Sequence, residues 1–158
     1  MIDTPWAPRA ADDLRAAGLR VTRSREAVYE ALRDRPHASA DDIHTLVMKR
    51  MPHTSLQSVY NALGDFVTAD LARRIEPAGR PMLFELHLRD NHHHAVCTSC
   101  GAVADVECAT GAAPCLHPAD PHGFSIQEAE ITFWGLCADC AASDPTIPTP
   151  PPHMEGKP

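Results

Sequence analysis

The chain has 158 residues, of which 44% are apolar and 22% charged, and its net charge is −7. This length suits one domain of ordinary size or two small ones, with enough apolar residues for folded cores. No run approaches the roughly 18 apolar residues of a membrane span, and Met1–Arg9 lacks the apolar run of a secretory signal. We therefore expect a cytoplasmic protein with no membrane partner, in which cysteines are metal ligands rather than disulfides.

Charge is distributed unevenly along the chain. Residues 1–80 contain 12 Lys and Arg against 11 Asp and Glu, whereas residues 81–158 contain 2 against 10. The asymmetry favours a first half that meets a polyanion, although this half is not strongly basic overall. Its arginines are clustered in two groups, which are Arg15, Arg20, Arg23 and Arg25, and Arg73, Arg74 and Arg80. The alternative is a solvated surface with scattered arginines.

The first half begins with two segments that have the spacing and capping residues of helices. Residues 10–17 predict a short helix followed by Gly18, a common residue just after a helix C-terminus. Thr22 can cap a second helix that runs to about Asp34. The predicted apolar face of this second helix is Ala27, Val28, Ala31 and Leu32.

The next two helices are predicted to form a helix-turn-helix. Ser39 and Asp42 have the spacing of a capping box, with Asp in place of the usual Glu or Gln, and Pro52 ends the helix. Its predicted buried face is Ile43, Leu46, Val47 and Met51. Ser55 can cap the following helix, whose predicted inner side is Leu56, Val59, Tyr60, Leu63, Phe66 and Val67. Two amphipathic helices joined by a short turn are typical of this motif, and the second would present outward Gln57, Ser58 and Asn61.

A hairpin is predicted after these helices. Leu71–Glu76 and Met82–His87 are strand-like runs around the turn signal Pro77–Arg80. Helices followed by a hairpin predict a winged helix, and the alternative is a small helical domain that uses its hairpin for another purpose.

The second half has a different character. Its predicted strands are Ala95–Cys97, Ala102–Val106 and Ser125–Trp134. Asp144–Pro158 holds six of the 15 prolines and almost no large apolar groups. Such a segment cannot bury enough surface to offset its ordering entropy, so we predict a disordered tail.

The cysteines include two C-x-x-C units, Cys97 with Cys100 and Cys137 with Cys140. Each such turn aims two thiolates at a point about 2.3 Å away, and two turns complete a tetrahedron around a metal. A site with four sulfurs leaves no open position, which indicates a structural rather than a catalytic zinc. The alternatives are thioredoxin-like redox motifs or plain buried cysteines, but neither pair has a βαβ context.

Histidines and carboxylates gather where the two halves meet. If the run His92–His94 begins a strand, His92 and His94 lie on one side of it and His93 lies on the other. Further candidate ligands are His37, Glu85, His87 and Asp105. Imidazoles with carboxylates suit Fe(II), Mn(II), Co(II), Ni(II) or Zn(II). A metal held by both halves would fix their angle, and the alternative is an exposed loop that is merely rich in histidine.

At these motifs the chain resembles the ferric-uptake-regulator (Fur) superfamily of bacterial metal-responsive repressors. The resemblance covers about residues 10–141 and rests on Leu19–Arg23, His37–Ile43, Ser58–Leu63, Phe84–Glu85 and His92–Gly101. Within this superfamily, the chain most resembles the redox-sensitive branch whose members are encoded beside catalase-peroxidase genes. The segments that carry this resemblance are Asp105–Cys108, Ala113–Cys115 and Glu130–Cys137.

The resemblance implies an α+β fold, with an N-terminal winged helix-turn-helix and a C-terminal αβ dimerisation domain with a four-cysteine zinc site. Residues 1–87 would bind DNA, 88–91 would form a hinge, 92–143 would dimerise and sense metal, and 144–158 would be the tail. The implied structural zinc ligands are Cys97, Cys100, Cys137 and Cys140. The implied regulatory metal ligands are His37, Glu85, His92, His94 and Asp105.

The resemblance also implies DNA contacts, because Tyr60 falls on the DNA-contacting tyrosine of the family. Base edges would be reached by Gln57, Ser58, Tyr60 and Asn61. Phosphates would be met by Arg15, Arg20, Arg23, Arg25 and Arg80. The chain departs from the family at Asn61 and Ser24, where an arginine and a proline are usual. Of the additional, third metal site only His93 is matched, since Asn91 stands at the expected ligand before it, and we expect that site to be absent or altered.

Cys108 and Cys115 are not among the implied zinc ligands. Two interpretations remain open. They form a reversible disulfide when oxidant rises, or they are unreactive thiols near the dimer surface.

These features predict a homodimeric, metal-dependent repressor of a palindromic double-stranded DNA operator, with no small-molecule substrate. The expected regulatory metal is Fe(II) or Mn(II), with Zn(II) or Ni(II) as alternatives. An aspartate at Asp105 is similar to the peroxide-sensing members, so we expect control of catalase-peroxidase or oxidative-stress genes and of the protein's own gene.

Rival functions are a zinc-, nickel- or manganese-sensing uptake regulator and a zinc-stapled protein–protein adaptor. A zinc hydrolase or nucleobase deaminase is not favoured, because the sequence contains neither H-x-E…P-C-x-x-C nor H-E-x-x-H. We therefore expect that the protein is not an enzyme.

Overall fold

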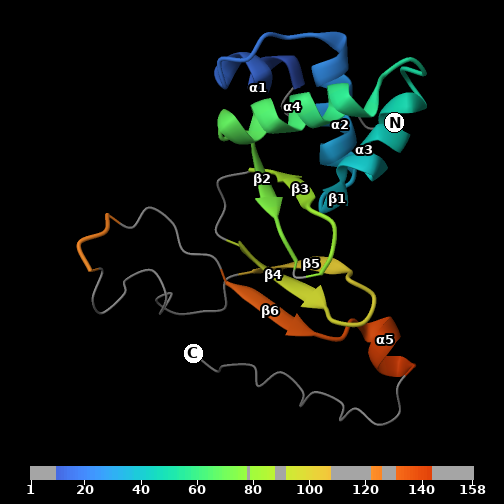
Figure 1. Cartoon of the computed structure of the whole chain (residues 1–158), viewed down its shortest axis with the longest axis vertical. Helices are drawn as coiled ribbons and strands as arrows, with labels where there is room; N and C mark the ends of the chain where they lie inside the picture. Colours follow the sequence, from blue (N-terminus) through green and yellow to red (C-terminus); the bar gives the residue numbers. More distant parts are fainter. Residues whose placement is uncertain (1–9, 78, 88–91, 108–121, 126–130, 144–158) are drawn as a thin grey trace, which may run out of the picture. The chain divides into compact units, whose positions relative to one another are not determined.

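The computed structural model describes residues 10–77, 79–87, 92–107, 122–125 and 131–143. The chain divides into two compact units, Met1–Asp90 and Asn91–Pro158 (Figure 1). The predicted hinge and the predicted tail lie outside the described residues. Within the described part of the chain, no helix has the length and hydrophobicity needed to cross a membrane.

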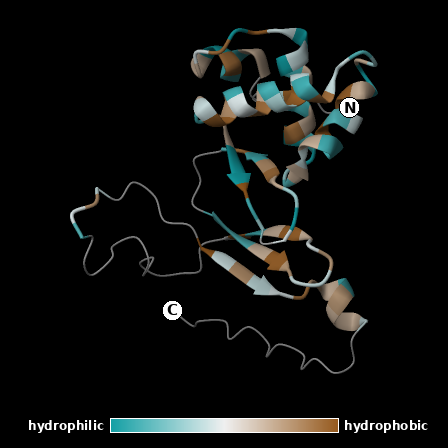
Figure 2. Ribbon diagram, in the orientation of Figure 1, coloured by the Kyte–Doolittle hydropathy of each residue, from teal (hydrophilic) through white to brown (hydrophobic). Residues whose placement is uncertain are grey.

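The first unit is mainly helical. Its elements are α1 (Ala10–Ala16), α2 (Arg23–Asp34), β1 (Ala38–Ser39), α3 (Ala40–Met48), α4 (Leu56–Thr68), β2 (Ala72–Ile75) and β3 (Leu83–Leu86). In Figure 2 the helices of this unit carry both hydrophilic and hydrophobic residues, as expected of amphipathic helices that cover a core.

The capping residues place the helix starts where the sequence predicts them. Thr22 accepts a hydrogen bond from the backbone N–H of Arg25, and Ser55 accepts one from that of Ser58. Ser39 and Asp42 form the predicted capping box, which begins α3. After α1, Gly18 has a φ of 73°, the left-handed conformation that glycine adopts without strain. By contrast, α3 ends at Met48, before the predicted stop at Pro52.

The core of the first unit lies between the helices and the hairpin. Its fully buried large side chains include Leu14, Val28, Leu32, Ile43, Val47, Val59, Leu63 and Phe66. The prediction for Tyr60 was wrong, because its side chain is 46% exposed and Ala62 is buried instead. At about 100° per residue, position 60 is turned away from the face that carries Val59 and Leu63.

One polar contact in this core was not predicted. The hydroxyl of Tyr29 donates a hydrogen bond to Asp13, so α1 and α2 are joined by a polar contact as well as by packing. Burial, together with this hydrogen bond, raises the pKa of Tyr29.

A three-stranded antiparallel sheet closes the first unit, with strand order β1-β3-β2. The predicted hairpin is confirmed, and its register pairs Ala72 with Leu86 and Ile75 with Leu83. The strand β1 was not predicted, since two residues are too few to show an alternating pattern. It pairs with β3 next to Glu85, which brings the segment around His37 to the hairpin.

The second unit contains another three-stranded sheet, in the order β5-β4-β6. Its elements are β4 (His92–Cys97), β5 (Val103–Glu107), β6 (Thr132–Gly135) and α5 (Ala138–Ala142). β4 pairs antiparallel with β5 and parallel with β6. The chain as a whole therefore has the mixed helix and strand content predicted for an α+β fold.

Two predictions for this unit need correction. The strand predicted over Ser125–Trp134 is shorter in the structure, because Ser125 is not in a strand, β6 begins at Thr132, and residues 126–130 lie outside the described residues. The helix α5 was not predicted at all. Its five residues are too few to show helical periodicity in the sequence.

The capping box provides a direct test of the local structure. Ser39→Ala removes the acceptor for the backbone N–H of Asp42, and we expect the free energy of unfolding to fall by about 1 kcal/mol. The measurement is urea unfolding of the full chain followed by circular dichroism. Thr45→Ala, an exposed change within the same helix, is the control and should stay within about 0.5 kcal/mol of the unmodified protein. Equal losses in both variants would show that the cap is not what stabilises α3.

Candidate metal centres and nucleic-acid interface

The four cysteines of the two C-x-x-C units meet at one end of the second sheet. One sulfur from each of Cys97, Cys100, Cys137 and Cys140 lies within 4.8 Å of the other three. The Sγ atoms of Cys100 and Cys137 are 3.7 Å apart. Two sulfurs bound tetrahedrally at about 2.3 Å from one zinc would be about 3.8 Å apart. The donor set and its spacing therefore fit a zinc ion.

The strand topology explains why these sulfurs meet. Because β4 and β6 run parallel, both C-x-x-C turns follow their strands at the same edge, and Cys97 is paired with Gly135 in the register. The backbone N–H of Thr98 donates to the carbonyl of Gly135 at 2.7 Å, which ties one turn to the other strand. Gly101 adopts a φ of 77° just after the first pair, so the chain can reverse tightly there.

Backbone N–H groups favour the thiolate form of Cys97, whereas the surroundings of Cys140 favour its thiol form. Backbone N–H groups, that of Cys100 first and then that of Cys137, lower the pKa of Cys97 to about 5. A hydrogen bond from Ser99 lowers the pKa of Cys140, but the neighbouring thiols and burial outweigh it and raise that pKa to about 12. Thiolate is the form that binds metal. A metal bound to all four sulfurs would displace any proton that remains on them.

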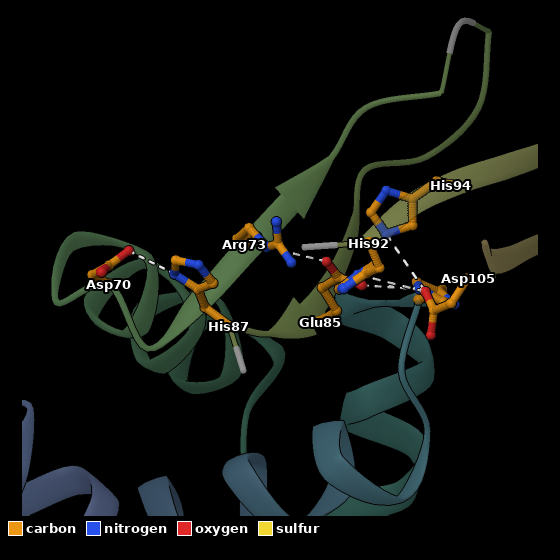
Figure 3. Close-up of polar contacts among 8 residues, drawn as sticks. Asp70, Arg73, Glu85, His87, His92, His94 and Asp105 are labelled. Carbon is orange, nitrogen blue, oxygen red and sulfur yellow. Dashed lines mark hydrogen bonds and ion pairs between the residues drawn. The ribbon is translucent and has the colours of Figure 1, made fainter. Parts of the chain in front are cut away.

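A second set of ligand atoms lies on β4 and β5, within the second unit. His92 and His94 are on the same side of β4, with ring centroids 5.0 Å apart. The Nε2 atom of each lies 3.7 Å from the same oxygen, Oδ1 of Asp105 (Figure 3). Ligand atoms that share an ion at about 2.1 Å lie roughly 3 to 4 Å apart. The distances from Asp105 to the two imidazoles are therefore each in the range of two ligands that share one metal.

His93 lies on the opposite face of β4, as the alternation of a strand requires. Its ring packs edge-on against Phe133, with centroids 6.2 Å apart, and the residue is 9% exposed. Asn91, the other position considered for a third metal site, lies outside the described residues.

The first unit holds the remaining predicted ligands as a close pair. His37 Nε2 lies 2.9 Å from Glu85 Oε2, and these side chains are only 10% and 4% exposed. His37 has a φ of 55°, a left-handed conformation that costs a non-glycine residue roughly 1–2 kcal/mol. His37 lies in the turn between α2 and β1, and from this turn its imidazole contacts Glu85. Backbone strain of this kind is typical of functional positions.

Two contacts of this hairpin were not predicted. Arg73 Nε lies 3.3 Å from Glu85 Oε1, and His87 Nδ1 lies 2.8 Å from Asp70 Oδ1 (Figure 3). In the structure His87 is therefore paired with Asp70 in its own unit. The predicted hairpin already contained the signal for the Arg73 pair, because a turn centred on residue 79 sets position 73 opposite position 85.

The helix α4 carries the residues predicted to read DNA. Gln57, Ser58, Tyr60 and Asn61 are all exposed in its first two turns. The side-chain amide of Gln57 donates to Oδ1 of Asn61 at 2.9 Å. An exposed row of amides and hydroxyls at the start of the second helix of a helix-turn-helix is suited to contact base edges.

A groove of about 350 Å³ lies beside this row. Its lining residues are Arg20, Thr22, Ser24, Arg25, Ser58, Asn61, Ala62 and Asp65. Arg25 forms an ion pair with Asp65 and donates to the backbone carbonyl of Arg20. Its guanidinium thus joins α2 to α4, whereas the side chain of Arg20 at the edge of the groove is exposed.

The other predicted phosphate contacts are at the surface. Arg23 and Arg80 are exposed, and Arg15 forms an exposed ion pair with Asp12 at 2.8 Å. The predicted redox residues Cys108 and Cys115 lie outside the described residues.

The first unit has a helix-turn-helix with a hairpin wing, which is a DNA-binding architecture. The same chain also carries a four-sulfur cluster and sets of imidazoles and carboxylates. Together these features define a metal-responsive transcription regulator rather than an enzyme. The sequence model of the Ferric uptake regulator family matches residues 16–134. The chain belongs to this family.

Individual relatives agree with this assignment. The transcriptional regulator FurA of Mycobacterium tuberculosis is 49% identical over 137 residues, covering 87% of this chain and 93% of that protein. The peroxide operon regulator of Bacillus subtilis is 27% identical over 136 residues, covering 85% and 93%. Among solved structures, the ferric uptake regulator from Pseudomonas aeruginosa with manganese has a TM-score of 0.62 at 26% identity, covering 82% of this chain and 98% of that one.

Proposed function

We propose that the protein is a homodimeric repressor whose affinity for a palindromic DNA operator depends on a regulatory metal. The observation that carries this proposal is the division of the predicted ligands. His37 and Glu85 belong to the first unit, and the other three belong to the second. An ion that took ligands from both units would fix their relative angle and so couple metal concentration to DNA affinity.

The domains of the proposal follow the two units. Residues 1–87 are the DNA-binding domain, and residues 92–143 dimerise and sense metal. Winged helices in a dimer bind half-sites one helical turn of DNA apart, or a multiple of it, so their angle decides whether both can bind. The exposed row on α4 would contact base edges, and the exposed arginines Arg20, Arg23 and Arg80 would contact phosphates.

The proposed metals follow from the donor atoms. Four thiolates select a structural zinc in a closed site, held by the C-x-x-C cysteines. Imidazoles and carboxylates are harder donors that suit Fe(II) or Mn(II), and Zn(II) or Ni(II) are alternatives. When Fe(II) is bound, it supplies the reactivity with peroxide. The residues themselves position the ion, and Asp105, with a side chain that is 52% exposed, is the most exposed of the three candidate ligands in the second unit.

Exposed apolar groups on the second sheet support a homodimer. Phe133 and Trp134 are 49% and 51% exposed on the edge strand β6. A mainly apolar groove of about 210 Å³ runs beside them along Val96, Val103 and Leu136. Large aromatic side chains left in water on an edge strand are the usual residues of a protein interface.

The proposed targets are catalase-peroxidase or oxidative-stress genes and the protein's own gene. Support comes from the similarity to FurA and to the peroxide operon regulator, and from the aspartate at Asp105. A zinc-, nickel- or manganese-sensing regulator of the same family remains the second candidate, because the same donors accept these ions.

The test is a gel-shift titration on the DNA upstream of the protein's own gene, with and without added Mn(II) or Fe(II), and after peroxide. We expect metal to tighten binding and peroxide to reverse the effect of Fe(II) only. Asn61→Ala, which removes a base-reading amide, should weaken binding by about 1–3 kcal/mol, or roughly 5- to 150-fold. Thr68→Ala at the exposed far end of α4 is the matched control. If the protein does not shift this DNA with or without metal, the result would favour the protein–protein adaptor instead.

A further inference from the structure

Glu85 is a carboxylate with only 3% exposure, and a basic residue of its own unit lies near each of its oxygens. His37 Nε2 lies 2.9 Å from Oε2, whereas Arg73 Nε lies 3.3 Å from Oε1. The pair of Arg73 and Glu85 is built into the hairpin, since the two residues lie directly opposite each other in the register of β2 and β3 (Figure 3).

A carboxylate at this depth needs a permanent counter-charge. An ionised group taken out of water is costly unless an opposite charge lies beside it. The imidazole of His37 carries a charge only when protonated, whereas a guanidinium is charged at every relevant pH. The Arg73 side chain is 23% exposed, so solvent screens this ion pair only in part.

We propose that Arg73 is a resident counter-cation that stabilises the metal-free regulatory site and thereby raises the metal concentration needed to fill it. This inference rests on the proposed function of His37 and Glu85 as regulatory ligands. A divalent ion bound to Glu85 would lie within several ångströms of the guanidinium, and like charges at that distance repel. Arg73 therefore favours the empty site and disfavours the filled one, and both effects weaken metal binding.

The geometry makes Arg73 a positioning residue and not a ligand. Oε2 of Glu85 faces Nε2 of His37, and a metal ion would bind to these two atoms. The Nε atom of Arg73 lies near the other oxygen, Oε1, as an ion pair without a hydrogen bond between these two atoms, so the guanidinium can stay in place when metal binds.

The neighbouring residue provides a matched control. Arg74 has the same charge and lies on the same strand, but it is exposed and paired in register with Phe84. Removing its charge changes the net charge of the protein equally without touching Glu85. A general effect of charge would therefore appear in both variants, whereas a specific effect would appear at Arg73 alone.

The experiment is a Co(II) titration of the zinc-loaded, full-length protein, followed by the visible absorption of the bound ion. We expect Arg73→Met and Arg73→Gln to bind Co(II) about tenfold more tightly than the unmodified protein. Arg73→Lys, which keeps the charge, and Arg74→Met should keep the original affinity. In the absence of Co(II), thermal unfolding of Arg73→Met should begin several degrees lower, at about 2–8 °C below the unmodified protein.

The outcomes separate this inference from the proposed function. If Arg73→Met binds Co(II) with unchanged or weaker affinity, the inference is overturned and the proposed function stands. If Arg73→Met does not fold, the affinity ratio of Arg73→Gln to Arg73→Lys decides, and a ratio near one overturns the inference. If the unmodified protein binds no Co(II) beyond its sulfur cluster, the proposed function fails, and the inference fails with it.

Discussion

Cys97→Ser should leave the protein without zinc and with its second unit unfolded at 25 °C. A structural zinc contributes roughly 10–16 kcal/mol in apparent terms, and a whole domain is stable by about 5–15 kcal/mol. Among the described residues, the buried hydrophobic side chains of the second unit are Val96 and Cys97 alone, so packing gives that unit little support. Zinc content, near-ultraviolet circular dichroism and gel filtration measure the loss.

The first unit should survive this change, because its hydrophobic cluster is made only of its own residues. Its helical circular dichroism should therefore persist while the dimer is lost. Cys115→Ser, which alters a cysteine not among the four ligands, is the control and should retain zinc. A Cys97→Ser protein that remained a zinc-loaded dimer would contradict the structural role of the cluster.

His92→Ala should abolish the dependence of operator binding on the regulatory metal while the protein stays folded, dimeric and loaded with zinc. The substitution removes one of the two imidazoles that share Oδ1 of Asp105, and each is 3.7 Å from that oxygen. Loss of one ligand from such a set weakens metal binding by at least the roughly 10- to 100-fold seen when an outer partner of a ligand is lost. Gel shifts across a series of Mn(II) concentrations provide the measurement.

The matched control for this experiment is His93→Ala. This residue is adjacent in sequence but lies on the other face of β4, against Phe133. Its removal should leave the metal dependence intact and affect only stability. If His92→Ala responded to Mn(II) as the unmodified protein does, the assignment of the regulatory ligands would be refuted.

The helix starts could be predicted from the sequence because capping is a local interaction. Thr22, Ser39 and Ser55 each accept a hydrogen bond from the backbone N–H three residues later. A few neighbouring residues are therefore enough to predict each helix start. The end of α3 was harder, since Pro52 sets only the last position that a helix can reach and not where it stops. The prediction that Tyr60 is buried was wrong, because position 60 lies at the boundary of the apolar face of α4. Burial at such a position depends on what packs beside the helix.

The candidate site shows the same division between local and distant information. The spacing within each C-x-x-C unit predicts a pair of sulfurs, and the parallel pairing of β4 with β6 brings the two pairs together. The contact of Arg73 with Glu85 was not predicted, because in the sequence Arg73 is one of a cluster of charged residues, which indicates an exposed surface. The register of the hairpin contains that contact, but the burial of Glu85 that gives it energetic weight comes from tertiary packing.

The parallel register of β4 and β6 has a consequence for assembly of the protein in the cell. A slip of one residue would displace Cys137 by about 3.3 Å, more than the length of a zinc–sulfur bond, and would leave the tetrahedron incomplete. A zinc ion bound by the four sulfurs would therefore stabilise only the native alignment of β4 with β6. A cell starved of zinc would accumulate chains that never become competent sensors, so supply of one metal would govern the response to another.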